Sequence, residues 1–447
     1  MKTPLSGNSL RAKSLRGAAL TLTSVGGTNL LRLGSNLILT RILFPEAFGL
    51  MALVQVFVTG LKMFSDTGIR ASIIQNKRGD DPDFLNTAWT LQIIRGLVLW
   101  LGTCALALPA AALYDAPLLA WLLPVVGIGT LISGFATTNV ATQNRHLILG
   151  RLTAIELGTQ ALNILIIVGL AWWLRSVWAL AIGAITGSIL TVLAQHWLLP
   201  GIRNRLHWDR AAFHELFGFG KFIFLSTAVS FVVAQGDKAI LGAYIPLAAL
   251  GVYNIGYFLG SIPQLLNQAV MSKVVFPLYR MKPISESPEN RAHIFRTRRI
   301  VIFCSVSFTM LMSYSGIALV EFLYDPRYAM AGPVVVLLNL VLVPGLVLKS
   351  YGAVFLSSGD SRQFFMLNAT TAVVQTVLMF VGVIWFSIFG VLIAQGLAIL
   401  ITYPFRVRAL RRHQAWDVVG DATLLSLGGV VNGLAVWWHW DAITQLM

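Results

Sequence analysis

Residues Leu39–Met51 read LTRILFPEAFGLM, and residues Leu241–Tyr253 read LGAYIPLAALGVY. The two stretches align without a gap at a shift of 202 residues, which pairs Gly49 with Gly251. Both stretches lie in apolar sequence, so the chain is predicted to be an internally duplicated membrane protein. Many transporters are built from two similar halves that rock about a site between them. Transport is therefore the first hypothesis for function.

The composition also indicates a membrane protein. The chain has 447 residues, of which 56% are hydrophobic and only 11% are charged, and its mean hydropathy is +0.75. Soluble proteins carry about 25% charged residues. Apolar runs of roughly 20 residues, the length that crosses the hydrocarbon core as a helix, recur along the chain. Helices are expected because each one satisfies its own backbone hydrogen bonds in lipid.

The predicted fold class is an all-α integral membrane protein with two parallel six-helix bundles around a central cavity. The twelve transmembrane helices are predicted at residues 16–43, 47–70, 84–113, 117–142, 152–174, 176–199, 219–245, 248–276, 300–324, 329–358, 363–387 and 389–404. With six helices in each half, both halves start on the same side of the membrane, as parallel repeats do. A thirteenth apolar segment is predicted at 423–440. Further along, the shift grows to 211 and pairs Gly134 with Gly345.

The distribution of basic residues predicts the topology. Alternate connections, beginning with the N-terminal segment and counted together with the helix ends that adjoin them, hold 24 of the 33 lysines and arginines. The other connections, counted in the same way, hold three, and the helix interiors hold six. This bias is the positive-inside pattern, which places the N-terminus in the cytoplasm. The net charge of +15 is therefore interpreted as a topology signal, and no nucleic-acid partner is predicted.

The domain organisation follows from these helices. It is predicted as an N-terminal six-helix lobe at 1–200, a cytoplasmic amphipathic connection at 201–220, a C-terminal six-helix lobe at 221–410, and a basic linker with the extra apolar segment at 411–447. Within the connection, Trp208, Ala212 and Leu216 share an apolar face that is typical of a helix lying at the membrane surface. Asp209 is the predicted N-cap of this helix.

No motif for chemistry stands out. The loops are too short to form a soluble catalytic domain, no His/Cys cluster has zinc spacing, and no GxxxxGK[ST] phosphate-binding loop is present. The chain is therefore predicted not to be an enzyme, with no catalytic residue and no metal ligand. Transport is expected to draw on an ion gradient, the membrane potential or the gradient of the substrate.

Polar residues within the apolar helices are the candidates for a site. A charge at membrane depth costs about 2.5–3.5 kcal/mol on insertion scales, so it usually faces a cavity or a partner. At the 202-residue shift, Lys62 corresponds to Gln264 and Asp66 to Gln268. The first, second, seventh and eighth helices are therefore predicted to line one water-accessible cavity. The predicted substrate-binding residues are Arg32, Asn36, Lys62, Arg95, Lys238, Gln264 and Gln268.

Simpler roles are open for several of these charges. Lys62 and Asp66 are i,i+4 neighbours and can form an intrahelical pair. Glu156 lies close to the start of its helix, where it can cap the helix or form an ion pair. Lys273 and Lys349 lie toward the cytoplasmic side, where a lysine commonly extends to the membrane surface. The excess of Arg and Lys nevertheless favours an anionic substrate such as a pyrophosphate.

Short motifs along nearly the whole chain carry a family resemblance. They are Phe48-Gly49-Leu50, Asp66-Thr67-Gly68-Ile69, Gln143-Asn144-Arg145, Phe217-Gly218-Phe219-Gly220, Asp237-Lys238, Leu241-Gly242, Ala249 to Asn254, Phe276-Pro277 and Ser358-Gly359-Asp360. Together they resemble the Wzx-type polysaccharide flippases of the multidrug/oligosaccharidyl-lipid/polysaccharide exporter superfamily. Members have twelve or fourteen helices, so the thirteenth segment departs from the family pattern.

The resemblance implies a function and its partners. The substrate would be an oligosaccharide on a polyprenyl pyrophosphate carrier, moved by alternating access from the cytoplasmic to the outer leaflet of the bacterial inner membrane. The product would enter surface or exopolysaccharide synthesis, with membrane lipids and polysaccharide polymerase machinery as further partners. No cofactor is implied beyond coupling to protons or sodium ions.

The resemblance also suggests roles for the candidate residues. Arg32, Arg95 and Lys238 would attract the pyrophosphate or acidic sugars. Asn36, Gln264 and Gln268 would contact sugar hydroxyls. The ion-coupling candidates are Asp66, Asp237 and Glu156.

Four other functions compete with this interpretation. A drug or cation antiporter of the same superfamily predicts an acidic and aromatic cavity. A lipid II flippase predicts a role in cell-wall synthesis. A glycan polymerase or ligase would need larger outer loops, and a membrane scaffold would leave the matched polar positions of the two halves unexplained.

Overall fold

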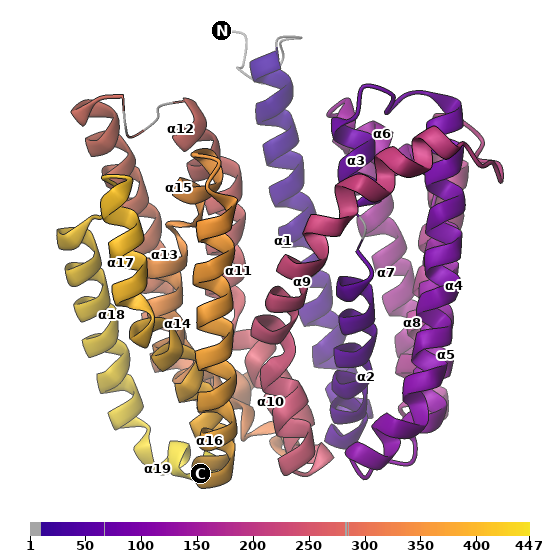
Figure 1. Ribbon diagram of the computed structural model, residues 1–447. Helices are drawn as coiled ribbons and strands as arrows, with labels where there is room; N and C mark the ends of the chain where they lie inside the picture. The colour runs from indigo at the N-terminus through magenta and orange to yellow at the C-terminus, as the bar shows by residue number, and fades with distance from the viewer. Residues whose placement is uncertain (1–9, 67, 282–283, 285) are drawn as a thin grey trace, which may run out of the picture. The chain divides into compact units, whose positions relative to one another are not determined.

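The computed structural model is all-helical over the residues that it describes (Figure 1). These are residues 10–66, 68–281, 284 and 286–447, with side chains described for all of them except 10–22, 217–226, 273–274 and 280. Within this part, eight helices are long and apolar enough to cross a membrane, or nine if one bent pair forms a single span. The predicted all-α membrane fold is confirmed, whereas the twelve-helix arrangement stays a prediction.

The chain divides into two compact units. Unit 1 runs up to Leu43 and resumes over Leu53–Phe231, and unit 2 comprises Phe44–Ala52 and Val232–Met447. The helices that begin in unit 1 are α1 (Leu10–Ile42), α3 (Ile69–Gln75), α4 (Pro82–Leu113), α5 (Leu119–Gly134), α6 (Asn139–Arg145), α7 (Leu149–Leu174), α8 (Trp178–Leu198) and α9 (Arg210–Tyr244). Helix α9 ends in unit 2, and α2 (Pro45–Phe64) begins in unit 2 and continues into unit 1.

Unit 2 holds the remaining helices. They are α10 (Leu247–Gly260), α11 (Ile262–Val270), the π-helix η1 (Met271–Val275), α12 (Phe276–Met281), α13 (Pro288–Leu323), the 3₁₀ helix η2 (Pro326–Tyr328), α14 (Ala331–Lys349), α15 (Gly352–Ser357), α16 (Ser361–Ile401), α17 (Tyr403–Arg412), α18 (Val418–Trp438), α19 (Trp440–Ile443) and the 3₁₀ helix η3 (Thr444–Leu446). The predicted thirteenth apolar segment therefore corresponds to α18, a continuous helix that is long enough to cross the membrane.

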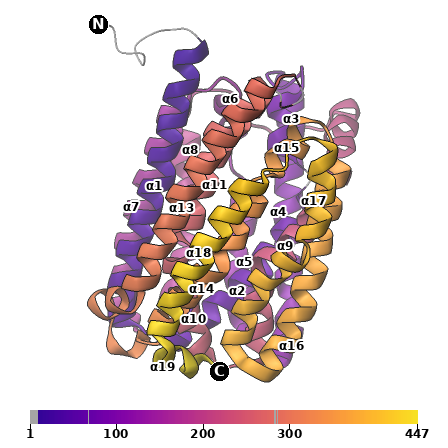
Figure 2. The ribbon, with the colours of Figure 1, turned by 90° about the vertical axis from the view of Figure 1, so that its left-hand side faces the viewer.

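Helix α14 forms the centre of unit 2. Nearly all of its side chains are buried, and α10, α13, α16 and α18 pack around it (Figure 2). Glycines make room for this contact: a Cβ on Gly256 would lie 2.8 Å from Cβ of Val334, and one on Gly316 would lie 2.9 Å from Val335. Small residues at helix crossings let membrane helices approach closely.

Helix α16 contains a reversal of the chain. Phe386 and Ser387 leave the helical conformation, with φ of 48° at Ser387. Gly382 and Gly390 then face each other, because a Cβ on Gly382 would lie 2.6 Å from the carbonyl carbon of Gly390. The two predicted helices 363–387 and 389–404 are thus the two arms of a hairpin whose turn falls at the predicted boundary.

The two copies of the repeated motif touch each other inside unit 2. A Cβ on Gly49 would collide with the carbonyl oxygen of Leu247, and a Cβ on Gly251 would collide with that of Pro45. Pro45 and Leu247 are separated by the same 202 residues as the two glycines. The contact is therefore exchanged between equivalent positions of α2 and α10, as an approximate twofold axis requires.

The central connection does not form a separate element. Helix α9 begins at Arg210 and continues to Tyr244, so it crosses the predicted boundary at residue 220 without a break. Asp209 caps the helix as predicted, because its carboxylate accepts the N–H groups of Ala211 and Ala212 at 3.0 and 3.3 Å. Ala212 and Leu216 are buried in a cluster with residues of α3 and α4, so this part of the apolar face packs against protein.

Candidate functional site

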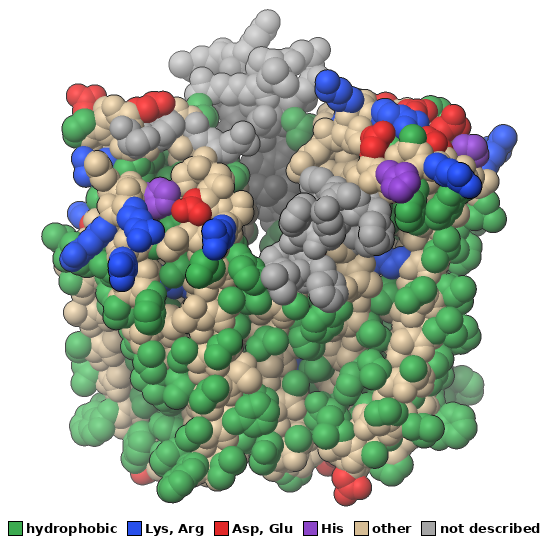
Figure 3. All heavy atoms as spheres, viewed as in Figure 1, with side chains coloured by type: hydrophobic (Ala, Val, Ile, Leu, Met, Phe, Trp, Pro, Cys, Tyr) green, Lys and Arg blue, Asp and Glu red, His purple; other side chains and the backbone are tan. Residues whose placement is uncertain are grey.

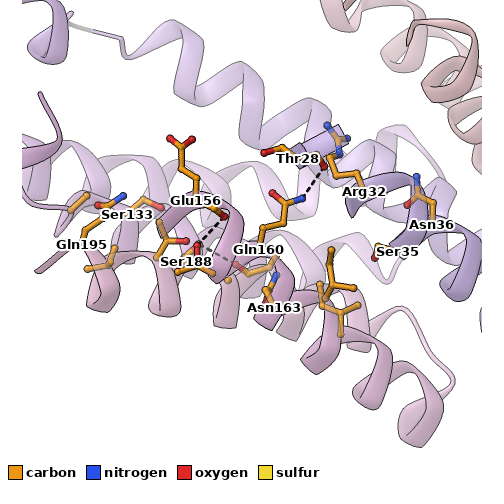
Figure 4. Close-up of a pocket in the computed structure, with 18 of the residues that line it drawn as sticks. Thr28, Arg32, Ser35, Asn36, Ser133, Glu156, Gln160, Asn163, Ser188 and Gln195 are labelled. Carbon is orange, nitrogen blue, oxygen red and sulfur yellow. Dashed lines mark hydrogen bonds between the residues drawn. The ribbon is translucent and has the colours of Figure 1, made fainter. Parts of the chain in front are cut away.

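Unit 1 contains a cavity of about 780 Å³ between α1, α3, α5, α7 and α8, and most of its lining residues are polar (Figure 4). Its charged lining residues are Arg32, Arg70 and Glu156. The other polar lining residues are the amides Asn36, Gln160, Asn163 and Gln195 and the hydroxyl residues Thr28, Ser35, Ser133, Thr159, Ser188 and Thr191. No aromatic side chain is among its described lining residues.

Hydrogen bonds position part of this lining. Ser24 Oγ donates to Glu156 Oε2 at 2.6 Å and so joins α1 to α7. Gln160 Nε2 donates to the backbone oxygen of Thr28 at 3.4 Å, and Thr186 Oγ1 donates to Asn163 Oδ1 at 3.0 Å, which joins α7 to α8. The cavity therefore combines fixed acceptors and donors with two guanidinium groups.

Unit 2 contains a cavity of about 690 Å³ with a more apolar wall. Its polar lining residues are Tyr257, Gln264, Asn267, Gln268, Ser272, Lys349, Ser350, Gln375 and Gln395. Its apolar wall includes Met271, Phe276, Val341, Leu342, Leu346, Leu356, Phe364 and Ile399. Lys349 is the only ionisable cation and no carboxylate is present among its described lining residues.

The two cavities are built from equivalent parts of the repeat. At the shift of 202, Arg32 corresponds to Ala234 and Arg70 to Ser272, and each of these four residues lines the cavity of its own unit. Further pairs at the shift of 211 are Ile164 with Gln375, Ala184 with Gln395 and Ser188 with Ile399. Equivalent positions of the two halves therefore line the two cavities, while the chemistry of the lining has diverged.

The structure distributes the predicted site residues over several places. Arg32, Asn36 and Glu156 line the cavity of unit 1. Gln264 and Gln268 line the cavity of unit 2. A single cavity that collects all seven predicted substrate-binding residues stays a prediction.

Lys62, Arg95 and Asp66 lie outside the two cavity linings. Arg95 Nη2 donates to the backbone oxygen of Lys62 at 2.8 Å, and its Nε donates to Ser65 Oγ at 3.0 Å. Asp66 accepts the N–H of Gly68 at 3.0 Å and forms no ion pair with Lys62. The suggested i,i+4 pair is wrong because α2 ends at Phe64, so Asp66 no longer follows the helical spacing.

Asp237 occupies the most enclosed setting among the ion-coupling candidates. It is 2% exposed, and Tyr253 donates its hydroxyl to Asp237 Oδ2 at 2.5 Å. Oδ1 has no hydrogen-bond partner among the described residues. The neighbouring Lys238 extends instead over the ring of Tyr257, 5.2 Å from its centroid, and forms no ion pair with Asp237.

Two features were not predicted from the sequence. Lys349, interpreted as extending to the membrane surface, lines the cavity of unit 2. Arg298 and Arg299, counted with a cytoplasmic connection, join Asp417 and Asp421 in a largely buried ion-pair cluster. Hydropathy could not distinguish a cation at the membrane surface from one in a cavity or a buried ion pair, since each of these cations borders an apolar run.

Among the described residues, no group of three or more His, Cys, Asp or Glu side chains could hold a metal ion.

Comparison with known proteins identifies the family. Residues 38–333 match the family described as polysaccharide biosynthesis protein. The teichuronic acid biosynthesis protein TuaB of Bacillus subtilis is 22% identical over 333 residues, which cover 71% of this chain and 66% of TuaB. The lipopolysaccharide biosynthesis protein WzxC of Escherichia coli is 23% identical over 61% of this chain and 55% of WzxC. The matched part of the chain thus spans 66% of the length of TuaB and 55% of the length of WzxC.

Solved structures share the fold at low sequence identity. The lipid II flippase MurJ in an inward closed conformation matches with a TM-score of 0.68 and 12% identity over 96% of this chain and 100% of that one. An inward-facing multidrug resistance MATE family transporter matches with a TM-score of 0.63 and 15% identity over 90% of this chain and all of its own. This multi-pass membrane chain, with the fold of those transporters, belongs to the polysaccharide biosynthesis protein family.

Proposed function

We propose that the protein is a flippase for a polyprenyl-pyrophosphate-linked oligosaccharide. It would move this lipid from the cytoplasmic to the outer leaflet of the bacterial inner membrane, for assembly of a surface or exported polysaccharide. Membership of the family supports the proposal, as do relatives named for teichuronic acid and lipopolysaccharide biosynthesis and a succinoglycan biosynthesis transport protein. The observation that carries it is the polar cavity among the membrane helices of unit 1.

The lining of that cavity suits a glycan. Sugar hydroxyls both donate and accept hydrogen bonds, and carboxamides and hydroxyl side chains offer both functions. Arg32 and Arg70 add charge-assisted donors for a phosphate or an acidic sugar. An antiporter for cationic drugs would favour acidic and aromatic groups, whereas this cavity has two arginines, one glutamate and no aromatic group among its described lining residues.

Asp237 is the proposed coupling residue. A buried carboxylate without a cation is unfavourable in an apolar interior, so this group is suited to bind a proton or a sodium ion in one state of the cycle. Oδ1 is buried and has no hydrogen-bond partner among the described residues, and Oδ2 accepts the Tyr253 hydroxyl. Glu156 is exposed and bonded to Ser24, and Asp66 lies in a turn, which makes both less suitable.

The proposal includes orientation and partners. The protein would work without enzymatic chemistry, with its N-terminus in the cytoplasm and with membrane lipids around it. The outer product would pass to polysaccharide polymerase machinery. Alternating access would present the substrate to one side of the membrane and then to the other.

The test is reconstitution of the full chain in liposomes with a fluorescent polyprenyl-pyrophosphate oligosaccharide. We expect the labelled lipid to become accessible in the opposite leaflet faster than in protein-free liposomes. Arg32→Gln should slow this step, whereas Arg151→Gln, an exposed cation on α7 outside the cavity lining, should not. Correctly folded protein that leaves the rate at the protein-free level would refute the flippase.

A second experiment tests ion coupling. With an imposed proton or sodium gradient, the wild-type rate should rise for the coupled ion, and Asp237→Asn should abolish that rise. Glu156→Gln serves as the comparison, since it removes a different intramembrane carboxyl group. If Asp237→Asn responds to both gradients as the wild type does, coupling does not pass through this residue.

A further inference from the structure

We propose that the cavity of unit 2 is an anion subsite in which Lys349 binds a phosphate group of the lipid-linked ligand. The inference rests on the proposed function. It identifies the residue that binds the phosphate part of the substrate, a lysine that the sequence analysis interpreted as extending to the membrane surface. Three observations carry it: the exposure of Lys349 within a buried helix, the absence of a countercharge, and the mixed chemistry of the cavity wall.

Lys349 is the exposed exception on α14. Apart from Lys349, every residue of this helix from Ala331 onward is buried or only partly exposed, because α14 is the centre of unit 2. Lys349 lies in the last turn and lines the cavity of about 690 Å³. Its exposed surface is therefore directed at this cavity, where a ligand can reach the ammonium group.

Among the residues that the structure describes, no acidic group is paired with Lys349. No carboxylate is among the described residues of the cavity lining, and Lys349 takes part in no ion pair with a described residue. The ionisable group that acts on it most is Arg406, another cation. Arg406 is 3% exposed, donates to Thr371 Oγ1 at 3.2 Å, and has no partner for its Nε.

Arg298 provides the contrast within the same unit. It is completely buried, but Asp421 accepts its Nη2 at 2.7 Å and Asp417 lies 3.5 Å from its Nη1. That cluster contains its own countercharges, whereas no described carboxylate forms an ion pair with Lys349 or Arg406. A charge without a partner is unfavourable in an apolar interior, so an anion bound beside Lys349 would stabilise this end of the cavity.

The rest of the wall indicates what kind of anion fits. Gln264 and Gln268 are one helical turn apart on α11, so their amides lie on one face and both line the cavity. Amide N–H groups can donate to phosphate oxygens. The apolar part of the wall, which includes Leu342, Leu346 and Phe364, can pack against a hydrocarbon chain. A phosphate joined to an apolar chain satisfies both surfaces, whereas a free phosphate ion leaves the apolar part unused.

The repeat shows that Lys349 is not an inherited feature of both cavities. Its counterpart at the shift of 211 is Thr138, which is buried. Conversely, Arg32 of unit 1 corresponds to Ala234 in unit 2. The cations of the two cavities therefore occupy positions that are not equivalent in the repeat.

The test is direct binding to the full chain in nanodiscs, with three probes: farnesyl pyrophosphate, inorganic pyrophosphate and farnesol. Lys349→Gln removes the charge, Lys349→Arg keeps it, and Arg408→Gln removes an exposed cation of α17 that lies outside the cavity. We expect Lys349→Gln to weaken farnesyl pyrophosphate about tenfold, equivalent to about 1.4 kcal/mol. Lys349→Arg and Arg408→Gln should bind within about threefold of the wild type.

Three results would overturn the assignment. The first is unchanged binding of farnesyl pyrophosphate in Lys349→Gln. The second is an equal loss of farnesol affinity in Lys349→Gln, which would indicate altered packing. The third is binding of inorganic pyrophosphate as tight as that of farnesyl pyrophosphate, which would indicate a site for a free anion. The flipping assay separates this inference from the proposed function. Wild-type protein that binds farnesyl pyrophosphate through Lys349 but does not flip would refute only the function, and equal flipping by wild type and Lys349→Gln would refute only the subsite.

Discussion

Arg298 shows how a single charge can be accommodated inside a membrane protein. Its side chain is 0% exposed, and its guanidinium group lies 3.8 Å from the ring centroid of Tyr351. Asp421 accepts hydrogen bonds from Arg298, Tyr351 and Tyr403 at 2.7, 2.8 and 2.9 Å. Asp421 thus accepts three hydrogen bonds. The cluster joins α18 to α13, and Arg298 also donates to the backbone oxygen of Val347 near the end of α14.

Removal of the countercharge should destabilise the protein. Asp421→Asn leaves the buried Arg298 without its closest carboxylate, and breaking a buried pair typically costs about 3–5 kcal/mol. We expect a clearly lower unfolding temperature in detergent. Asp441→Asn, on the exposed surface of α19, is the matched control and should unfold as the wild type does. Equal unfolding temperatures for both variants would contradict a structural role for this pair.

At the scale of helices, the contact between α2 and α10 depends on the absence of two side chains. Gly49 and Gly251 bring the backbones together, and each faces a carbonyl oxygen of the other helix. Around this contact, Phe48 packs edge-on against Tyr328 at 5.9 Å between ring centroids. The motif that marks the duplication in the sequence is thus also the place where its two copies meet.

Alanine at either glycine should disrupt this contact. In Gly49→Ala and Gly251→Ala the new methyl group meets backbone, which cannot rotate away as a side chain can, and overpacking typically costs about 1–3 kcal/mol. Thermal unfolding of the purified variants measures the effect. Gly433→Ala on α18, where a Cβ meets open space, should be neutral or stabilising. Gly49 and Gly251 variants as stable as Gly433→Ala would argue against the close approach.

Arg78 connects the turn before α4 to the segment before α9. Its guanidinium lies 2.8 Å from Asp81, 3.0 Å from Asp209 and 3.4 Å from Glu215. The hydrogen bond from Arg78, aided by the N–H of Ala211, holds the pKa of Asp209 below its usual value of 3.8. The attachment of residues 201–209 to unit 1 should therefore depend on the ionised form of Asp209.

This dependence predicts a pH effect with a definite sign. Because the folded-state pKa is lowered, the contribution of Asp209 is present above the unfolded value and is lost as the pH falls through the folded pKa, that is, below 3.8. Hydrogen exchange of residues 201–209 should rise in that acid range. In Asp209→Asn it should already be raised at pH 6 and vary less with acid, while Asp115→Asn behaves as the wild type. A wild-type pH profile in Asp209→Asn would exclude this mechanism.

At the scale of the whole chain, the surface agrees with a membrane-spanning protein. In each unit, charged side chains gather at the end that carries the turn between α3 and α4 or between α17 and α18, and hydrophobic side chains cover much of the remaining visible face (Figure 3). Trp172 and Trp173 at the end of α7, and Trp437 and Trp438 at the end of α18, are all at least 70% exposed. Tryptophan is enriched at membrane interfaces.

The course of α18 predicts the side of the C-terminus. Its start is joined by Asp417 to Arg299 in the first half of α13, and the two helices pack together. Because the start of α13 follows a basic connection predicted to be cytoplasmic, α18 should end on the outer side. Single cysteines in a chain with Cys104 and Cys304 replaced by serine test this with an impermeant maleimide.

The expected labelling pattern is specific. Asp115→Cys and Gln445→Cys should react in intact spheroplasts, whereas Arg412→Cys should react only after permeabilisation. All three positions are exposed, so a difference reports the side of the membrane. If Gln445→Cys requires permeabilisation while Asp115→Cys does not, α18 does not cross the membrane.

The sequence alone determined what depends on local pattern. Apolar runs located the helices, the position of the hairpin turn in α16 and the apolar α18 segment, because the hydrophobic effect acts on each stretch of chain by itself. The repeat at Gly49 and Gly251 indicated a duplication, and short motifs indicated the family. These signals add up along the chain and need no knowledge of which residues meet.

Only the tertiary structure decided which charges have partners. Arg298 and Lys349 both border apolar sequence, yet Arg298 meets Asp421, 123 residues further along the chain, while Lys349 faces an open cavity. Likewise, the candidate Lys62 does not pair with Asp66, because α2 ends before Asp66. Coulomb interaction depends on distance in space and on the surrounding dielectric, and helix packing sets both.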